Sequence, residues 1–292
     1  MFQGKCEGSR FFCTQIVLSN LNGKSSIASR RKSDRRKLFQ LINMSHFLPP
    51  AFVPITAPPT LLSIGYPAFF TTIACAVIDI LLVYCVFPRE WRSIHKGSVK
   101  YSYYLSAFLY QLGIFTPLGF LIWQEYGYSL NEVSTSTSFT DGTHSKWAIV
   151  HSYFFIAYMI RDIPNCTTQL DLLAHHVLVI VFTLSHLFEP EAPFSLYALC
   201  GSAFEVPGAT NNIALVLTEK RWKNIVFPIN ALLFTLSHLF GLYWCFIALR
   251  GNTRLWFKIM CPAISIPVMY LRQYYSTKLF LENLRDDAKK SD

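Results

Sequence analysis

From residue 61 onward the chain consists largely of long apolar segments separated by short loops, and this pattern restricts its possible folds more than any other feature. A helix needs about 20 apolar residues, at roughly 1.5 Å each, to cross the hydrocarbon core of a bilayer. Seven segments approach or exceed that length: 61–87, 101–123, 147–160, 172–188, 192–217, 225–249 and 255–280. The third and fourth are short, and Glu205, Pro207 and Gly208 interrupt the fifth. We therefore expect an all-α, polytopic membrane helix bundle with six or seven transmembrane helices.

Composition and charge agree with a membrane protein. Of the 292 residues, 52% are hydrophobic and only 15% are charged, against about 25% charged residues in soluble domains. The formal net charge of +9 is concentrated in residues 1–40, where nine Lys and Arg residues outnumber Glu7 and Asp34. No basic domain with interleaved aromatic residues follows. Positive charge at a membrane surface explains this distribution, so we expect no nucleic-acid partner.

The chain divides into three parts. Residues 1–60 are basic and then rich in proline, which predicts a disordered N-terminal tail. The beginning of this tail also resembles an organellar transit peptide, and Met44 is an alternative start. Residues 61–280 form the predicted transmembrane domain, and residues 281–292 form a charged C-terminal tail.

Basic residues between the apolar segments predict an orientation. They cluster in residues 88–100, in residues 218–224, and from Arg272 to the C-terminus. With seven spans these clusters share one side of the membrane, which the positive-inside rule assigns to the cytosol. The basic N-terminal tail would then lie on the opposite side. Either the tail is absent from the mature protein or the count is wrong by one span.

The cysteines show no paired spacing typical of a disulfide framework or a zinc site. Five of the eight fall in apolar segments, and we expect them to be small, reduced core residues: Cys75, Cys85, Cys200, Cys245 and Cys261.

A polar stripe runs along the fourth apolar segment. Asp171, His175 and His186 share one helical face with positions 179 and 182. An ionisable group that faces lipid costs several kcal/mol, so this face should turn toward the interior of the bundle or a wet cavity.

The pair His175–His176 is the strongest candidate for chemistry. Consecutive helical residues point about 100° apart, so one imidazole can face a cavity while the other packs against a neighbour. Asp171, one turn before His175, would orient the imidazole, which then acts as a general base or nucleophile near neutral pH. Glu205 would converge from the next segment. A metal site of His175, His186 and Glu205 uses the same residues but lacks the close ligand set of HExxH sites, so no metal is expected.

The other polar residues within the segments have weaker signals. Asp79 and the Arg161–Asp162 pair are expected to cap helices or to pair at the membrane interface. Interior histidines such as His238 more often have a structural role than a functional one. We nevertheless name four candidates for contacts with a substrate: His151, Asp162, His186 and Asn212.

These motifs resemble those of the TLC-domain family, which includes ceramide synthases and smaller TLC-domain-containing proteins. DLLAHH at 171–176 carries the resemblance, together with HSYFFIAY at 151–158 and with Trp91–Arg92 before a Tyr-rich segment. The resemblance covers about residues 65–280. It implies membrane helices around a central lipid cavity that takes an acyl chain.

The resemblance implies acyl-transfer chemistry, but one of the two motifs for that chemistry is missing from this chain. In ceramide synthases the paired histidines and a later H-D-x-x-D element are thought to transfer an acyl group from acyl-CoA to a sphingoid amine. His175 and His176 match the first element, but the second is absent. Glu205 and Asn212 instead resemble the E-x-x-x-x-x-x-N pattern of the non-synthase branch.

We therefore expect a protein of lipid metabolism or lipid homeostasis in the endoplasmic reticulum or another endomembrane. If it is an enzyme, the resemblance implies acyl transfer with acyl-CoA as a substrate and a membrane lipid as partner. The main alternative is a non-catalytic lipid sensor, chaperone or carrier. A transporter is a third class, suggested by the interrupted fifth segment, although no inverted repeat supports it. If the chain assembles, a homodimer is expected.

Overall fold

The computed structural model describes residues 61–96, 99–135, 145–166, 170–189, 191–217 and 219–291. The predicted tail at residues 1–60, with its transit-peptide and Met44 alternatives, lies outside the described residues.

The described part is almost entirely helical, with one short antiparallel ribbon. The ribbon consists of β1 (His95–Lys96) and β2 (Val99–Lys100). The short helices are η3 (Leu82–Val86), η4 (Arg89–Arg92), η5 (Gln111–Phe115) and α5 (Leu130–Thr135). The longer helices are α2 (Leu61–Leu81), α3 (Tyr101–Tyr110), α4 (Thr116–Glu125), α6 (Lys146–Cys166), α7 (Leu170–Phe188), α8 (Phe194–Val216), α9 (Lys220–Arg250) and α10 (Leu255–Ser291).

Five helical segments of the described chain are long and apolar enough to cross a membrane. They are Ile64–Val86, Tyr101–Glu125, Leu170–Phe188, Arg221–Arg250 and Leu255–Arg285. These segments indicate an all-helical, integral membrane protein. Helices α6 and α8 are not among the five.

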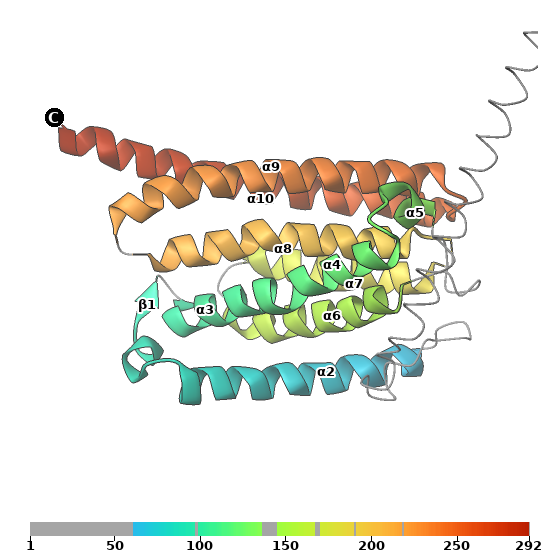
Figure 1. The fold of residues 1–292 in the computed structure, drawn as a ribbon, viewed down its shortest axis with the longest axis horizontal. Coiled ribbons are helices and arrows are strands. Elements are labelled where there is room, and N and C mark those ends of the chain that lie inside the picture. The colour runs from blue at the N-terminus through green and yellow to red at the C-terminus, as the bar shows by residue number, and fades with distance from the viewer. Residues whose placement is uncertain are drawn as a thin grey trace, which may run out of the picture. The chain divides into compact units, whose positions relative to one another are not determined.

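The long helices alternate in direction through the bundle (Figure 1). The ribbon before α3 and the turn between α8 and α9 lie at one end, at the left of the figure, where α10 also finishes. Helix α5 lies at the opposite end. The basic residues of the 88–100 and 218–224 regions therefore gather at the same end of the bundle.

Helix α8 forms the centre of the packing. It contacts α3, α4, α6 and α9, and α2 packs on the far side of α6. Large apolar side chains of α2, α9 and α10 point outward, as expected for helices in contact with lipid. Examples are Phe69, Ile73, Leu232, Leu239, Ile259 and Ile266.

Small residues allow the closest helix contacts. A Cβ atom at Gly119 of α4 would lie 2.5 Å from the Cβ of Ser202 in α8. A Cβ at Gly241 of α9 would lie 2.5 Å from the Phe204 ring. Both separations are too short for real atoms, so these helices approach each other only because glycine stands at these positions.

The expected break in the fifth apolar segment is wrong, because α8 continues as a helix through Pro207. Proline removes one backbone donor and disturbs the preceding turn. The carbonyl that loses its backbone partner is that of Ala203, four residues earlier. Two side-chain donors bond to other carbonyls of the same turns: the Thr210 hydroxyl donates to the Pro207 carbonyl at 2.9 Å, and Arg272 donates to the Phe204 carbonyl at 2.7 Å. Such side-chain donors stabilise a proline-containing helix within a membrane.

Two further details refine the sequence-based picture. Helix α10 runs without interruption to Ser291, so Arg272 belongs to the bundle and the segment after residue 280 continues the same helix. The five cysteines in apolar segments are free thiols, and all except Cys85 are buried.

Candidate functional site

Two cavities that share three lining residues lie between α7, α8 and α10. The larger measures about 390 Å³ and has a partly polar lining, with Asp162, His176 and Glu205 among its side chains. The smaller measures about 60 Å³ and is mainly apolar. His175, Val268 and Arg272 line both cavities. These three residues therefore mark the junction between a polar compartment and an apolar one.

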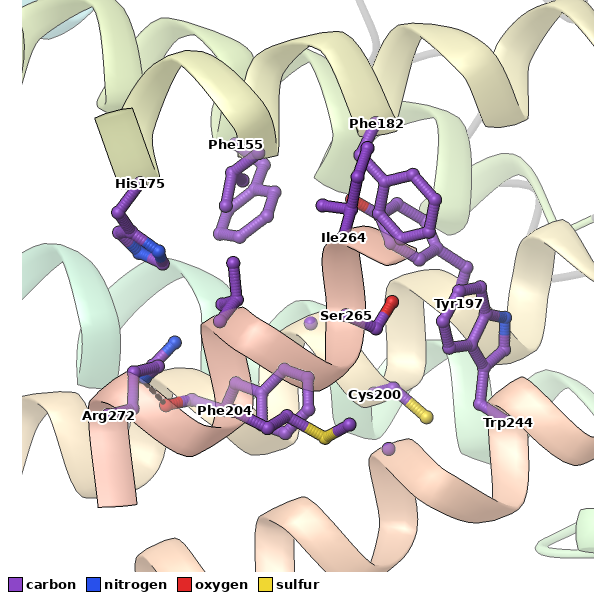
Figure 2. A pocket seen from close by; sticks show the side chains of 15 residues that line it. Phe155, His175, Phe182, Tyr197, Cys200, Phe204, Trp244, Ile264, Ser265 and Arg272 are labelled. Atoms are coloured by element: carbon purple, nitrogen blue, oxygen red, sulfur yellow. Dashed lines mark hydrogen bonds between the residues drawn. The ribbon is translucent and has the colours of Figure 1, made fainter. Parts of the chain in front are cut away.

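Figure 2 shows the smaller cavity. His175 and Arg272 lie at one end, and Tyr197 and Trp244 lie at the other. Most side chains between them are apolar, and Phe155 of α6 is one of them. The lining of this compartment is therefore mainly apolar, in contrast to that of the larger cavity.

Four of the five positions of the polar stripe of α7 line a cavity, and the fifth, His186, is buried outside both linings. Asp171 and His175 line the larger cavity, and His175, Val179 and Phe182 line the smaller one. These positions share one side of α7 because an α-helix repeats every 3.6 residues.

The two adjacent histidines have different environments. Nδ1 of His176 lies 2.7 Å from the Leu172 carbonyl, and Nε2 lies 3.4 Å from Oδ2 of Asp162 in α6. The ring of His175 lies 5.4 Å from that of His176. Among the described residues, His175 has no hydrogen-bond partner. His176 is thus held by its neighbours, and the nitrogens of His175 are left for a ligand.

The expected contact between Asp171 and His175 is not formed. The Asp171 carboxylate instead accepts a hydrogen bond from the Tyr275 hydroxyl of α10. Asp171 is exposed at the first turn of α7, where a carboxylate also interacts favourably with the helix dipole. The carboxylate that contacts the histidine pair is Asp162, and its partner is His176.

Asp162 is itself part of an ionic cluster. Arg161 donates to Asp162 at 2.7 Å and also to Asp79 and Ser106. Its guanidinium lies over the rings of Tyr103, Tyr110 and Tyr158, at 5.2, 4.9 and 5.6 Å. The cluster fixes Asp162 beside His176 and joins α2, α3 and α6.

Glu205 and Asn212 are joined through a residue that the sequence did not single out. Nε2 of Gln111 donates to Oε2 of Glu205 at 2.8 Å, and Nδ2 of Asn212 donates to Oε1 of Gln111 at 2.8 Å. All three side chains line the larger cavity. The spacing of the E-x-x-x-x-x-x-N pattern places both ends on one face of α8, and η5 supplies the bridging amide.

His151 and His186 lie away from both cavity linings. His151 is fully buried beside Phe115 and Phe155, and neither of its ring nitrogens has a hydrogen-bond partner in the part of the chain that the structure describes. His186 is also fully buried and stacks on Tyr197 with 3.8 Å between ring centroids. These positions favour a packing role over the substrate contact expected from the sequence.

Sequence reasoning missed Gln111, Arg272 and Tyr275. Arg272 could have been identified from the sequence, because a basic residue inside an apolar segment is a candidate functional group. Its place near the basic C-terminal residues instead suggests a surface charge. Gln111 and Tyr275 are polar residues of ordinary type in helices, and only the contacts between helices distinguish them.

Comparisons with known proteins give no further assignment: no family model, curated protein or solved structure matches this chain. Within the described residues, no group of three His, Cys, Asp or Glu side chains is arranged to hold a metal ion.

Proposed function

We propose that this chain is a membrane protein that binds a single-chain lipid within its helix bundle, at the two cavities between α7, α8 and α10. The observation that carries this proposal is that a partly polar cavity and a mainly apolar one lie side by side inside the bundle and share His175, Val268 and Arg272 in their linings. The resemblance to TLC-domain proteins agrees with it.

A substitution at the junction tests lipid binding. Val268→Trp would place a large side chain at a position that lines both cavities, whereas Ile266→Trp places the same side chain two residues away, where the native residue is exposed on the outer surface. Mass spectrometry of lipids that co-purify with the full chain should detect a lipid with wild type and Ile266→Trp, at about one per chain. Val268→Trp should lose it. Equal lipid content in both variants would contradict the proposal.

Acyl transfer is the second candidate, favoured by the arrangement of Asp162, His176 and His175. His175 would accept a proton from the hydroxyl or amine of an acceptor as its oxygen or nitrogen attacks an acyl thioester. The carbon–sulfur bond would break, and the coenzyme A thiolate would take the proton from His175. Gln111, which donates to Glu205, would position that carboxylate beside the acceptor.

A comparison of two substitutions separates catalysis from binding. His175→Gln keeps a polar side chain but cannot accept the proton, whereas His175→Ala loses both properties. Lipids of cells expressing each variant at matched level and location should lack the new product if His175 is a base. A lipid pool that changes with wild type and equally with both variants would favour the sensor, chaperone or carrier.

We also propose seven membrane spans, with α6 and α8 crossing as interior helices. At 21 and 23 residues they are about 31 and 34 Å long, enough to cross the hydrocarbon core. Their burial among other helices explains a lower apolar content than in the lipid-facing spans. The endoplasmic reticulum or another endomembrane remains our prediction for location.

A further inference from the structure

We propose that the larger cavity recognises a ligand group that donates a hydrogen bond, a hydroxyl or an amide N–H, and that the side-chain carbonyl of Asn212 accepts this bond. The inference rests on the proposed lipid-binding function and specifies the polar group of the lipid. It follows from the direction of the hydrogen bonds among three side chains of the cavity lining, which are Gln111, Glu205 and Asn212.

Glu205 determines the direction of the first hydrogen bond. Its side chain is buried and supplies the counter-charge of Arg272. A carboxylate can only accept hydrogen bonds, so the atom of Gln111 that faces it must be a donor. Nε2 of Gln111 is that donor, at 2.8 Å from Oε2 of Glu205.

The direction of the first bond determines that of the second. Because Nε2 of Gln111 is directed to Glu205, the acceptor atom Oε1 is left for Asn212, and Nδ2 of Asn212 donates to it at 2.8 Å. The amide of Asn212 therefore uses its nitrogen toward Gln111 and keeps its oxygen, Oδ1, for another donor. Within the described residues, Oδ1 has no hydrogen-bond partner.

The surrounding helices hold the Gln111 amide in one position. Gln111 is buried and begins η5, a π-helical turn of a kind that is frequent at functional sites. The Thr116 hydroxyl donates to its backbone carbonyl at 2.9 Å. A Cβ atom at Gly208 would lie only 2.6 Å from Nε2 of Gln111, so α8 closely limits the space around the amide. Asn212 must therefore present its carbonyl to the cavity.

A ligand can reach this carbonyl. The cavity measures about 390 Å³, which lies within the size range of small-molecule sites. Asp171 and Tyr275 of its lining are exposed, so the cavity is open to the outside. Asn212 is half-buried, and an acceptor that loses water without gaining a partner costs free energy. A donor on the ligand would supply the missing hydrogen bond.

Two ligands that differ by one donor test the proposal with the full-length protein in detergent. Oleyl alcohol carries a hydroxyl, and its methyl ether has the same chain and oxygen without the O–H group. Each competes with radiolabelled oleyl alcohol. We expect the alcohol to bind about tenfold more tightly, because the ether cannot donate to Oδ1 of Asn212. Oleamide, an N–H donor on the same chain, should also bind more tightly than the ether, and its rank against the alcohol identifies the preferred donor.

Substitutions then assign that preference to Asn212. Asn212→Leu should lower the affinity for the alcohol about tenfold and leave that for the ether unchanged, so that both ligands bind alike. Asn211→Leu is the matched control, because Asn211 also lines the cavity but its carbonyl already accepts a hydrogen bond from Asn230, at 3.4 Å. It should keep the tenfold preference. Equal losses for alcohol and ether in Asn212→Leu would show a structural role alone and overturn the proposal.

Gln111→Leu tests the direction of the hydrogen bonds. Without Gln111, the Asn212 amide can rotate and present Nδ2 to the ligand. The ether, which accepts a hydrogen bond, should then bind more tightly than it does to wild type, while the alcohol keeps its affinity. General damage to the structure would not raise the affinity for one ligand. A preference for the alcohol that stays at the wild-type value in Gln111→Leu would contradict the proposal.

The outcomes also separate this inference from the proposed function. If the wild type binds the ether as tightly as the alcohol, lipid binding stands and the preference for a donor is refuted. If none of the three ligands binds, both proposals fail.

Discussion

At the residue scale, the histidine pair shows how neighbouring side chains divide their roles. His176 lies between the Leu172 carbonyl and Asp162, and His175 lines both cavities without a hydrogen-bond partner among the described residues. The helical repeat predicts this division, because adjacent residues point in different directions. Contacts with α6 decide which histidine is held and which is left for a ligand.

The two aspartates near the histidines should differ in their effect on stability. Asp162→Asn removes the charge that faces both Arg161 and His176 in a buried position. We expect it to cost about 1–3 kcal/mol of stability, the usual range for a disturbed buried hydrogen bond. Thermal unfolding of the purified protein in detergent would measure this loss as a lower melting temperature.

Asp171→Asn is the matched control for that experiment, because Asp171 is exposed and contacts a tyrosine instead of an arginine. Its melting temperature should stay at the wild-type value. A larger loss for Asp171→Asn than for Asp162→Asn would contradict the placement of Asp162 in the ionic cluster.

At the element scale, close helix packing determines the geometry of the polar cavity. Helix α8 carries Glu205 and Asn212, and η5 carries the Gln111 amide that bridges them. Gly208 lies opposite this amide, since a Cβ atom there would sit 2.6 Å from Nε2 of Gln111. The bridge therefore depends on the absence of a side chain at position 208.

Gly208→Ala should therefore displace Gln111 and break the link between Glu205 and Asn212. The expected loss is about 1–3 kcal/mol, as for other overpacked sites, with a lower affinity for the bound lipid. Gly113→Ala on η5 is the control, because a Cβ atom there meets nothing within 4 Å. Thermal unfolding and lipid-binding measurements on both variants test the pair. Equal stability and affinity in the two variants would show that the bridge does not depend on Gly208.

The sequence predicts the elements better than it predicts the contacts between them. All seven apolar segments coincide with long helices or helical runs, because apolar composition is a local property that each segment carries alone. The predicted break at Pro207 is wrong, because a proline removes only one backbone hydrogen bond and α8 is packed among other helices along its length. The contact between Asp162 and His176 also depends on packing between helices. Asp162 lies on α6, so the spacing of residues along α7 cannot predict it.

At the scale of the whole molecule, the alternating helices place the basic regions at one end of the bundle (Figure 1). If α6 and α8 cross the membrane, residues at the two ends of α8 lie on opposite sides. If only the five most apolar segments cross, both ends of α8 lie on the same side. The topology is therefore open to a direct test.

Cysteine labelling distinguishes these two topologies. Glu191→Cys and Glu219→Cys, each introduced into a chain whose own cysteines are replaced by serine, place a single thiol before and after α8. With seven spans, a membrane-impermeant maleimide added to intact cells or sealed vesicles should label one position, and the other should react only after permeabilisation. Labelling of both from the same side would contradict seven spans.

The central claim is that a single-chain lipid binds at the two cavities between α7, α8 and α10, and photocrosslinking tests it most directly. A fatty acid with a diazirine in mid-chain and a terminal alkyne would be incubated with the full-length protein, irradiated and mapped by peptide mass spectrometry. We predict crosslinks on the inward faces of α8 and α10, near Phe204, Ile264 and Met269, which excess unlabelled fatty acid abolishes. Crosslinks confined to the outward faces of α2 and α9, unaffected by competitor, would contradict the account.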